Sequence, residues 1–207
     1  MIEGLPGEPA IDARVRGLPD ATTAVLLCHP HPLYGWTMHS AVVVAIGQVL
    51  AEAGARVATL RFNYRGVGES GGTYGAGAGE TLDARAALGE LRARFPSAKK
   101  AVCGYSFGTW VGLRAAATPV TGAPVERVAL VAPAVRIFQF VREDAAAFQG
   151  RLAIYVGDND EFCDVAEAEA LSTNLGARLT VLPGNDHYFL AGRRRLADAV
   201  VPFLLDR

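Results

Sequence analysis

Short apolar runs alternate with longer amphipathic segments along most of the chain. Compact runs of aliphatic and β-branched residues predict β-strands at 23–28, 56–64, 101–105, 125–133, 151–157 and 178–184. Apolar positions at helical spacing predict α-helices at 40–54, 80–95, 106–118, 166–176 and 189–205. Alternating strands and helices form a mostly parallel sheet flanked by helices, so the pattern predicts the α/β fold class. In such sheets, ligands bind at the edge where the strands end, so the loops after the strands are searched first.

The composition fits one globular domain without a nucleic-acid or membrane partner. The chain has 207 residues, 51% of them hydrophobic, and a net charge of −1, so residues 1–207 are expected to form a single domain. The charges form no basic stripe, and no window approaches the roughly 18 apolar residues of a membrane span. Because the N-terminus lacks the pattern of a secretion signal, we expect a soluble cytoplasmic protein. The sequence leaves the oligomeric state open.

The pattern G-x-S-x-G occurs twice, as GESGG around Ser70 and as GYSFG around Ser106. A nucleophile elbow needs a strand that runs through a sharp turn directly into a helix. Ser106 has a predicted strand before it and a predicted helix after it. Ser70 precedes the glycine run GGTYGAGAG, in which a helix does not begin readily, so Ser70 is interpreted as a loop residue. The overlapping fingerprint GVGESG (66–71) lacks the helix that dinucleotide binding requires, and we expect no cofactor.

A serine nucleophile needs a histidine base that is oriented by a carboxylate. His187 lies just after the last predicted strand, in a loop expected at the same sheet edge as Ser106. The loop after the preceding strand, YVGDNDEF, offers Asp158, Asp160 and Glu161, and chemistry alone leaves all three open. Asp186 is interpreted as a loop acid, because neighbouring side chains in an irregular loop seldom face one another. The order Ser, Asp, His along the chain is that of α/β-hydrolases.

Five blocks strengthen this interpretation: HPHPLYG, RFNYRGVGESGG, GYSFG, GDNDE and DHYF, which together run from residue 29 to 189. With them the chain resembles the small, capless "predicted α/β-hydrolase" branch of the α/β-hydrolase superfamily. The resemblance implies Asp160 as the orienting acid, in preference to Asp158. Two departures lie near the expected site: Trp36 stands where the family usually has glycine, and Tyr188 where it has phenylalanine. Both bear on the shape of the substrate pocket.

The histidine-rich loop CHPHPLYGW (28–36) admits two interpretations. His29 and His31, with Cys28 beside them, have the ligand types of a zinc site, but the cluster lacks the carboxylate that a metallohydrolase usually adds. Alternatively, the loop supplies one backbone N–H of an oxyanion hole, while Phe107 supplies the other.

Pro30 and Pro32 have no N–H, which leaves His31, Leu33 or Tyr34 as the loop's donor. The resemblance favours His31. In this interpretation His29 braces the loop through a side-chain hydrogen bond, and no metal is bound.

The sequence thus predicts a serine hydrolase for small-molecule carboxylic esters, with thioesters or small amides as further substrates. Only about 17 residues separate the strand at 125–133 from the next one, which is too short for a cap domain. We expect an open pocket that includes Leu33, Tyr34, Trp36 and Tyr188. Further candidates for its wall are Trp110, Phe138 and Phe140. The rival hypotheses are a hydrolase-fold binding protein without turnover and a metal-dependent hydrolase that uses His29 and His31.

Overall fold

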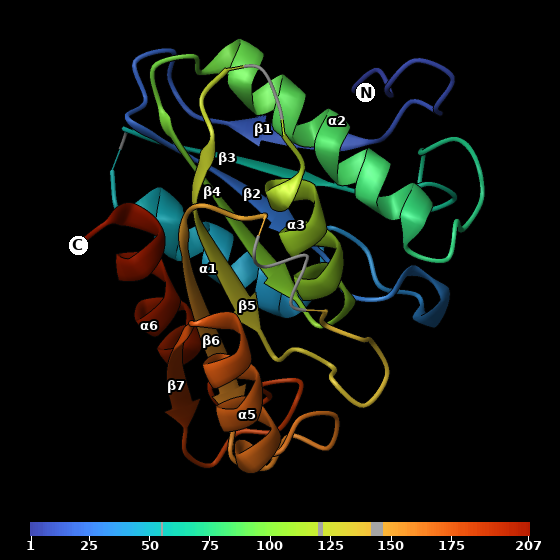
Figure 1. Cartoon of the computed structure of the whole chain (residues 1–207). Coiled ribbons are helices and arrows are strands. Elements are labelled where there is room, and N and C mark those ends of the chain that lie inside the picture. The colour runs from blue at the N-terminus through green and yellow to red at the C-terminus, as the bar shows by residue number, and fades with distance from the viewer. Residues whose placement is uncertain (55, 120–121, 142–146) are drawn as a thin grey trace.

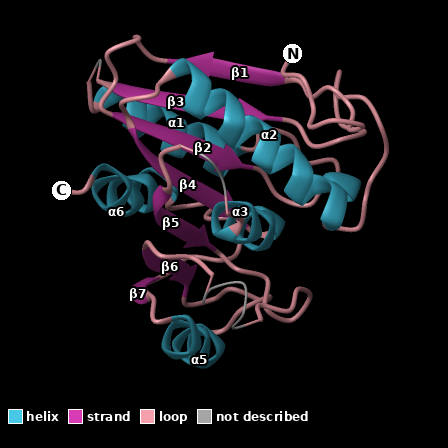
Figure 2. Ribbon diagram, turned by 45° about the horizontal axis from the view of Figure 1, so that its top comes forward, coloured by secondary structure: helices cyan, strands magenta, loops and turns pink. Residues whose placement is uncertain are grey.

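The computed structural model describes residues 1–54, 56–119, 122–141 and 147–207. Within these ranges one sheet has the strand order β1-β3-β2-β4-β5-β6-β7 (Figure 2). The strands are β1 (Ala13–Arg16), β2 (Thr23–Cys28), β3 (Val57–Phe62), β4 (Lys99–Tyr105), β5 (Val125–Val131), β6 (Arg151–Gly157) and β7 (Arg178–Leu182). All neighbouring strands are parallel except β1, which pairs antiparallel with β3 at one edge. The expected α/β class with a mostly parallel sheet is confirmed.

Helices cover both faces of the sheet. They are α1 (Ala41–Glu52), α2 (Ala78–Arg94), α3 (Phe107–Ala117), α5 (Val165–Leu175) and α6 (Arg193–Leu205), with a short 3-10 helix η1 (Pro32–Tyr34). Figure 1 shows α2, α3 and α5 on one face, and α1 with α6 on the other. None of the helices in the described part of the chain is both long and apolar enough to cross a membrane.

The two layers of helices bury alternate residues of the same strands. In β2, Leu26 and Cys28 pack with the α2, α3 and α5 side, whereas Val25 and Leu27 pack with the α1 and α6 side. Successive side chains of a strand point to opposite faces, so an almost uninterrupted apolar run is required when both faces are covered. This requirement explains why TAVLLC could be recognised as a central strand.

Strand β1 was not predicted. Its sequence, ARVR, alternates half-buried and exposed positions over only four residues. Such a short strand at the sheet edge carries little apolar signal. It is held by its antiparallel register against β3, from Ala13 opposite Phe62 to Arg16 opposite Thr59.

Helix α2 begins earlier than predicted, at Ala78, inside the end of the glycine run that follows Ser70. The side chain of Glu80 makes this start possible: its carboxylate accepts the N–H of Gly77 at 2.6 Å and that of Gly75 at 2.8 Å. Side-chain acceptors of this kind satisfy backbone donors that a helix start leaves unpaired. The start still lies well beyond Ser70, which remains a loop residue.

The segment between β5 and β6, which was expected to be too short for a cap domain, is described only in part. Residues 142–146 lie outside the described residues.

Candidate active site

Ser106 occupies a sharp turn between β4 and α3. Its backbone has φ 54° and ψ −118°, a region that non-glycine residues rarely adopt. Glycines on either side allow the surrounding chain to approach closely. A Cβ on Gly104 would lie 2.1 Å from the carbonyl oxygen of Gly108, and one on Gly108 would lie 2.4 Å from that of Cys28. The strand, turn and helix therefore form the elbow that the sequence predicted around Ser106.

Ser106, His187 and Asp160 form a continuous hydrogen-bonded chain. The Nε2 atom of His187 lies 3.0 Å from the Ser106 Oγ. Its Nδ1 atom lies 3.0 Å from each carboxylate oxygen of Asp160. A proton on Nδ1 is donated to Asp160, which leaves the lone pair of Nε2 free to accept the serine proton. This is the arrangement that activates a serine hydroxyl as a nucleophile.

Asp160 and Asp158 have different hydrogen-bond partners, and only Asp160 contacts His187. Asp160 Oδ1 also accepts the N–H groups of Phe162 at 2.8 Å and Cys163 at 3.2 Å, which fix the carboxylate toward the histidine. Asp158 instead accepts the N–H groups of Gly184 at 2.7 Å and Asn185 at 3.2 Å. It ties the acid-bearing loop to the histidine-bearing loop and does not contact the ring.

The loops after β6 and β7 are held together by further contacts. The N–H of Asn159 donates to the carbonyl of Asn185 at 3.0 Å, and a Cβ on Gly157 would lie 2.2 Å from the same oxygen. The hydroxyl of Tyr105 donates to the carbonyl of His187 at 3.1 Å. Neighbouring parallel strands thus bring the acid and the histidine to one sheet edge.

The remaining acids near these loops do not contact the His187 ring nitrogens. Glu161 is exposed, and its backbone carbonyl accepts a hydrogen bond from Arg136 at 2.8 Å. Asp186 accepts the N–H of Leu190 at 3.2 Å, a role within its own turn.

Of the candidate oxyanion donors, the backbone N–H groups of Phe107 and His31 have no acceptor among the described residues. The other two candidate donors of the histidine-rich loop are used within it. Leu33 donates to His31 Nδ1 at 3.3 Å, and Tyr34 donates to the His31 carbonyl at 3.3 Å. A stabilising site for an oxyanion needs N–H groups that are not already paired. The geometry therefore favours His31 over Leu33 and Tyr34.

His29 is fully buried and both of its ring nitrogens are occupied. Nδ1 lies 2.7 Å from the Pro30 carbonyl and donates to it, while Nε2 accepts the N–H of Tyr64 at 3.2 Å. Burial lowers the pKa of His29 to about 3, so the ring is neutral near neutral pH. It braces the loop through its side chain, as the second interpretation predicted.

His31 is likewise engaged in hydrogen bonds. Its Nδ1 accepts the N–H of Leu33, so the ring proton lies on Nε2, which is 3.1 Å from the hydroxyl of Tyr74. Partial burial lowers the pKa of His31. The described residues contain no group of three or more His, Cys, Asp or Glu that could hold a metal ion. Since the nitrogens of both histidines have other partners, the geometry does not present this pair as metal ligands.

Comparisons with known proteins identify the family of the chain. The family model described as "alpha/beta hydrolase fold" matches residues 23–202. The chain belongs to the alpha/beta hydrolase fold family. An uncharacterized protein of Rickettsia prowazekii is 30% identical over 196 residues, which cover 90% of this chain and 80% of that protein.

Two solved structures extend the comparison. A serine hydrolase without a lid from Xanthomonas campestris is 27% identical, with a TM-score of 0.79 and coverage of 99% of this chain and 97% of that one. A serine hydrolase homologue from Coxiella burnetii is also 27% identical, with a TM-score of 0.78 and coverage of 94% and 95%.

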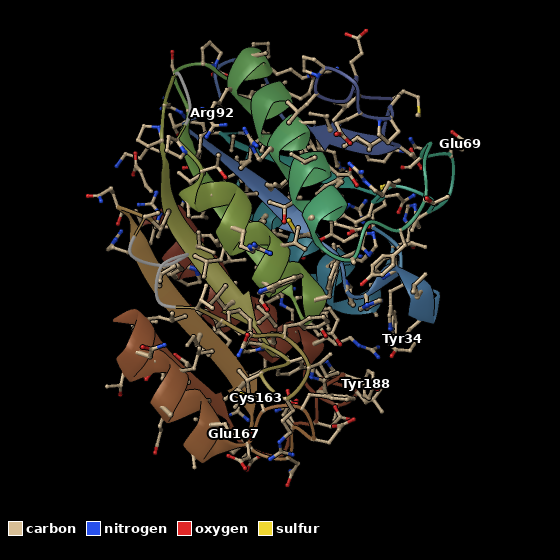
Figure 3. The ribbon with its side chains drawn as sticks, turned by 45° about the vertical axis from the view of Figure 1, so that its right-hand side comes forward. Tyr34, Glu69, Arg92, Cys163, Glu167 and Tyr188 are labelled. Atoms are coloured by element: carbon tan, nitrogen blue, oxygen red, sulfur yellow. The ribbon has the colours of Figure 1, made fainter. Side chains whose placement is uncertain are left out.

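A pocket of about 460 Å³ is lined by Ser106 and His187. Its wall is largely aromatic. The aromatic side chains that line it include His31, Tyr34, Trp36, Phe138, Phe162 and Tyr188. Figure 3 shows the labelled Tyr34 and Tyr188, from loops far apart in the sequence, at the same edge of the molecule. The volume lies within the range of sites for small molecules.

The lining of this pocket departs from the sequence expectation in part. Leu33 does not line it; the residue is 65% exposed, because the turn of η1 carries it outward while its N–H bonds back to His31. Phe138 lines the pocket, whereas Trp110 stacks behind it with ring centroids 5.4 Å apart. Phe140 packs against the core on the α2, α3 and α5 side of the sheet and does not line the pocket.

Sequence reasoning missed Ile137, Phe162 and Cys163. Phe162 and Ile137 line the pocket, and the backbone N–H of Cys163 orients Asp160. Two sequence signals existed for Phe162 and Cys163: they lie two and three residues after Asp160, and they stand where the resembling family commonly has a Val-Val-Pro-like run.

All three cysteines are buried and free. Burial raises the pKa of Cys28 to about 12 and that of Cys103 further, so neither is a thiolate near neutral pH.

Proposed function

We propose that this chain is a serine hydrolase that cleaves carboxylic esters of small, uncharged acyl groups. The observation that carries the proposal is the position of His187, whose two ring nitrogens lie 3.0 Å from the Ser106 hydroxyl and 3.0 Å from the Asp160 carboxylate. A hydroxyl becomes an effective nucleophile when a base of this kind can take its proton during attack.

The reaction follows from these contacts. Ser106 Oγ attacks the acyl carbon while His187 Nε2 takes the hydroxyl proton, and Asp160 stabilises the resulting imidazolium. The charge that develops on the carbonyl oxygen is accepted by the N–H groups of Phe107 and His31. His187 then gives the proton to the leaving oxygen, and the ester C–O bond breaks. Water repeats the attack on the acyl-enzyme and releases the acid.

The pocket supports an uncharged ester as the substrate. Its wall is mainly aromatic and aliphatic, and the described residues that line it include no lysine or arginine. A carboxylate or phosphate on the substrate would lose its hydration there without gaining a charged partner, which is unfavourable. Neutral acyl and alcohol groups would gain from burial against the same wall.

Intact mass after incubation with a fluorophosphonate tests the proposal. Wild-type protein is expected to gain one adduct, with or without a chelator, whereas Ser106→Ala gains none. Ser70→Ala is the matched control, because it alters the other G-x-S-x-G serine and should label like wild type. An unlabelled wild type would overturn the proposal in favour of a binding protein. Loss of turnover with chelator alone would favour the metal-dependent reaction.

A further inference from the structure

Trp36 and Tyr188, two of the residues at which this chain departs from the family pattern, meet in space. Their rings stack with centroids 6.2 Å apart and an interplanar angle of 28°. Both line the pocket, although they belong to the loops that follow β2 and β7. Together they make a continuous aromatic surface beside the reacting groups.

This surface lies on the histidine side of the pocket. The Tyr188 ring lies 5.4 Å from the ring of His187, and Phe162 lies 4.7 Å from it with its edge toward the imidazole. The rings of Trp36, Phe162 and Tyr188 are called the aromatic subsite below.

The proposed reaction orients an ester relative to the aromatic subsite. At the tetrahedral stage the reacting carbon carries four groups: Ser106 Oγ, the former carbonyl oxygen, the leaving oxygen and the rest of the acyl group. The carbonyl oxygen faces the N–H groups of His31 and Phe107, and the leaving oxygen must lie next to His187 Nε2 to receive its proton. The alcohol part of the ester therefore extends toward the rings around His187.

The acyl group then extends toward another part of the wall, which contains Ala134, Ile137 and Phe138. The Phe138 ring lies 6.0 Å from that of His31, and the segment adjoins the aromatic subsite where the N–H of Arg136 donates to the Phe162 carbonyl at 3.3 Å. The alcohol and acyl parts of an ester are thus expected to contact different side chains, so selectivity for each can be measured separately.

We propose that the aromatic subsite binds the alcohol portion of the substrate and selects alcohols that carry an aromatic ring, such as benzyl alcohol. This inference rests on the proposed ester hydrolysis. Aromatic rings gain from offset stacking or edge contacts beyond the gain from burial alone, and a saturated ring of similar size lacks this contribution. Trp36, Phe162 and Tyr188 are accordingly specificity-determining residues.

The test compares hydrolysis of benzyl acetate with that of cyclohexylmethyl acetate. Each alcohol carries a six-membered ring on a CH₂ group, so size and leaving-group chemistry are nearly matched. In each case water and the ester yield acetate and the free alcohol. We expect kcat/KM for benzyl acetate to be about threefold to tenfold higher in wild type, as the stacking contribution implies.

Variants test whether the ratio of kcat/KM between benzyl acetate and cyclohexylmethyl acetate depends on the aromatic subsite. Trp36→Leu and Tyr188→Leu keep apolar bulk and should bring the ratio close to one, whereas Tyr188→Phe keeps the ring and should preserve it. Ile137→Ala should change the preference between benzyl acetate and benzyl hexanoate but not the ratio between alcohols. Leu18→Ala, an exposed apolar residue that does not line the pocket, should change neither. Thermal melts establish that each variant is folded.

The outcomes separate the two proposals. If acetates are hydrolysed but the ratio is near one in wild type, or stays high in folded Trp36→Leu and Tyr188→Leu, the aromatic subsite is refuted and ester hydrolysis stands. If neither ester is hydrolysed and Ser106 takes no fluorophosphonate, ester hydrolysis itself fails. A ratio that falls in both leucine variants and persists in Tyr188→Phe supports the aromatic subsite.

Discussion

The two G-x-S-x-G segments have the same sequence pattern but place their serines in opposite situations. Their accessibilities are nearly equal, 8% for Ser70 and 9% for Ser106, so burial does not distinguish them. Their hydrogen-bond partners do. Ser70 Oγ accepts the N–H of Asp12 at 2.8 Å and donates to the Asn63 carbonyl at 2.9 Å. Ser106 Oγ instead faces His187 and the pocket.

The difference lies in what the flanking chain permits. Ser106 is held between a strand and a helix in a turn that turns its hydroxyl away from backbone partners. Ser70 lies in a loop whose own carbonyl and amide groups need partners, and its hydroxyl supplies them. A hydroxyl that is fully used by the backbone stabilises the fold, whereas one that meets a histidine base can react.

The largest difference between the two serines is expected in catalytic activity. Ser106→Ala is expected to lower kcat for ester hydrolysis by a factor on the order of 10⁴ or more, because no other hydroxyl of the described residues is hydrogen-bonded to His187 Nε2. Ser70→Ala should retain kcat within a few-fold, since the serine is not part of the pocket. Steady-state assays of both purified variants check this. Comparable losses in the two would contradict the distinction.

A second pair of similar residues, Asp158 and Asp160, gives the next largest contrast. Asp160→Asn should reduce kcat by a factor on the order of 10³ to 10⁴, because the amide cannot hold His187 in the tautomer that accepts the serine proton. Asp158→Asn keeps an oxygen for the N–H groups of Gly184 and Asn185, and we expect a loss of less than about tenfold. The pH-rate profiles of both variants provide the measurement. A larger loss in Asp158→Asn would reverse the assignment of the orienting acid.

The third pair, His29 and His31, differs in burial. The fully buried His29 should make the stability of the protein depend on pH. The pKa of His29 is lowered to about 3 in the folded chain, against about 6.5 when unfolded. Below pH 6.5 the unfolded chain therefore binds a proton that the folded chain does not. Stability should fall as the pH drops from about 6.5 toward 3, by up to about 1.4 kcal/mol per pH unit from this residue.

Urea unfolding at pH 7, 6 and 5 measures that slope. His29→Asn is expected to be less stable at pH 7, but its stability should fall less steeply as the pH drops. The number of protons taken up on unfolding should be smaller by about one than in wild type. His39→Asn, the same substitution at an exposed position, is the matched control. An unchanged slope in His29→Asn would show that His29 is not the buried neutral group described here.

The fold was predictable where burial on both faces made the signal strong. Strands such as 23–28 and 125–133 are recognisable because each side chain meets a helix layer, and their alternation with helices fixes the parallel sheet. Strand β1 gave no comparable signal, because four residues at an edge bury one face only in part. The early start of α2 depends on the Glu80 carboxylate folding back onto Gly77, which residue spacing alone does not reveal.

The candidate site was predictable as a set of loops but not in its details. The strand and helix around Ser106 and the place of His187 after the last strand pointed to the right edge of the sheet. The choice among Asp158, Asp160 and Glu161 needed either the family resemblance or the observed hydrogen bonds. Likewise, Leu33 lies outside the pocket and Phe162 inside it because of turns that tertiary contacts set.

The smallest expected effect concerns Ser70 itself and tests its structural role directly. Ser70→Ala leaves the buried N–H of Asp12 and the carbonyl of Asn63 without their partner, which should cost about 1–3 kcal/mol of unfolding free energy. Ser97→Ala, at an exposed turn position, should stay within about 0.5 kcal/mol of wild type. Urea unfolding of both variants at neutral pH provides the values. Equal stabilities of the two variants would mean that the backbone groups of the loop find other partners without Ser70. The structural role assigned to the Ser70 hydroxyl would then be wrong.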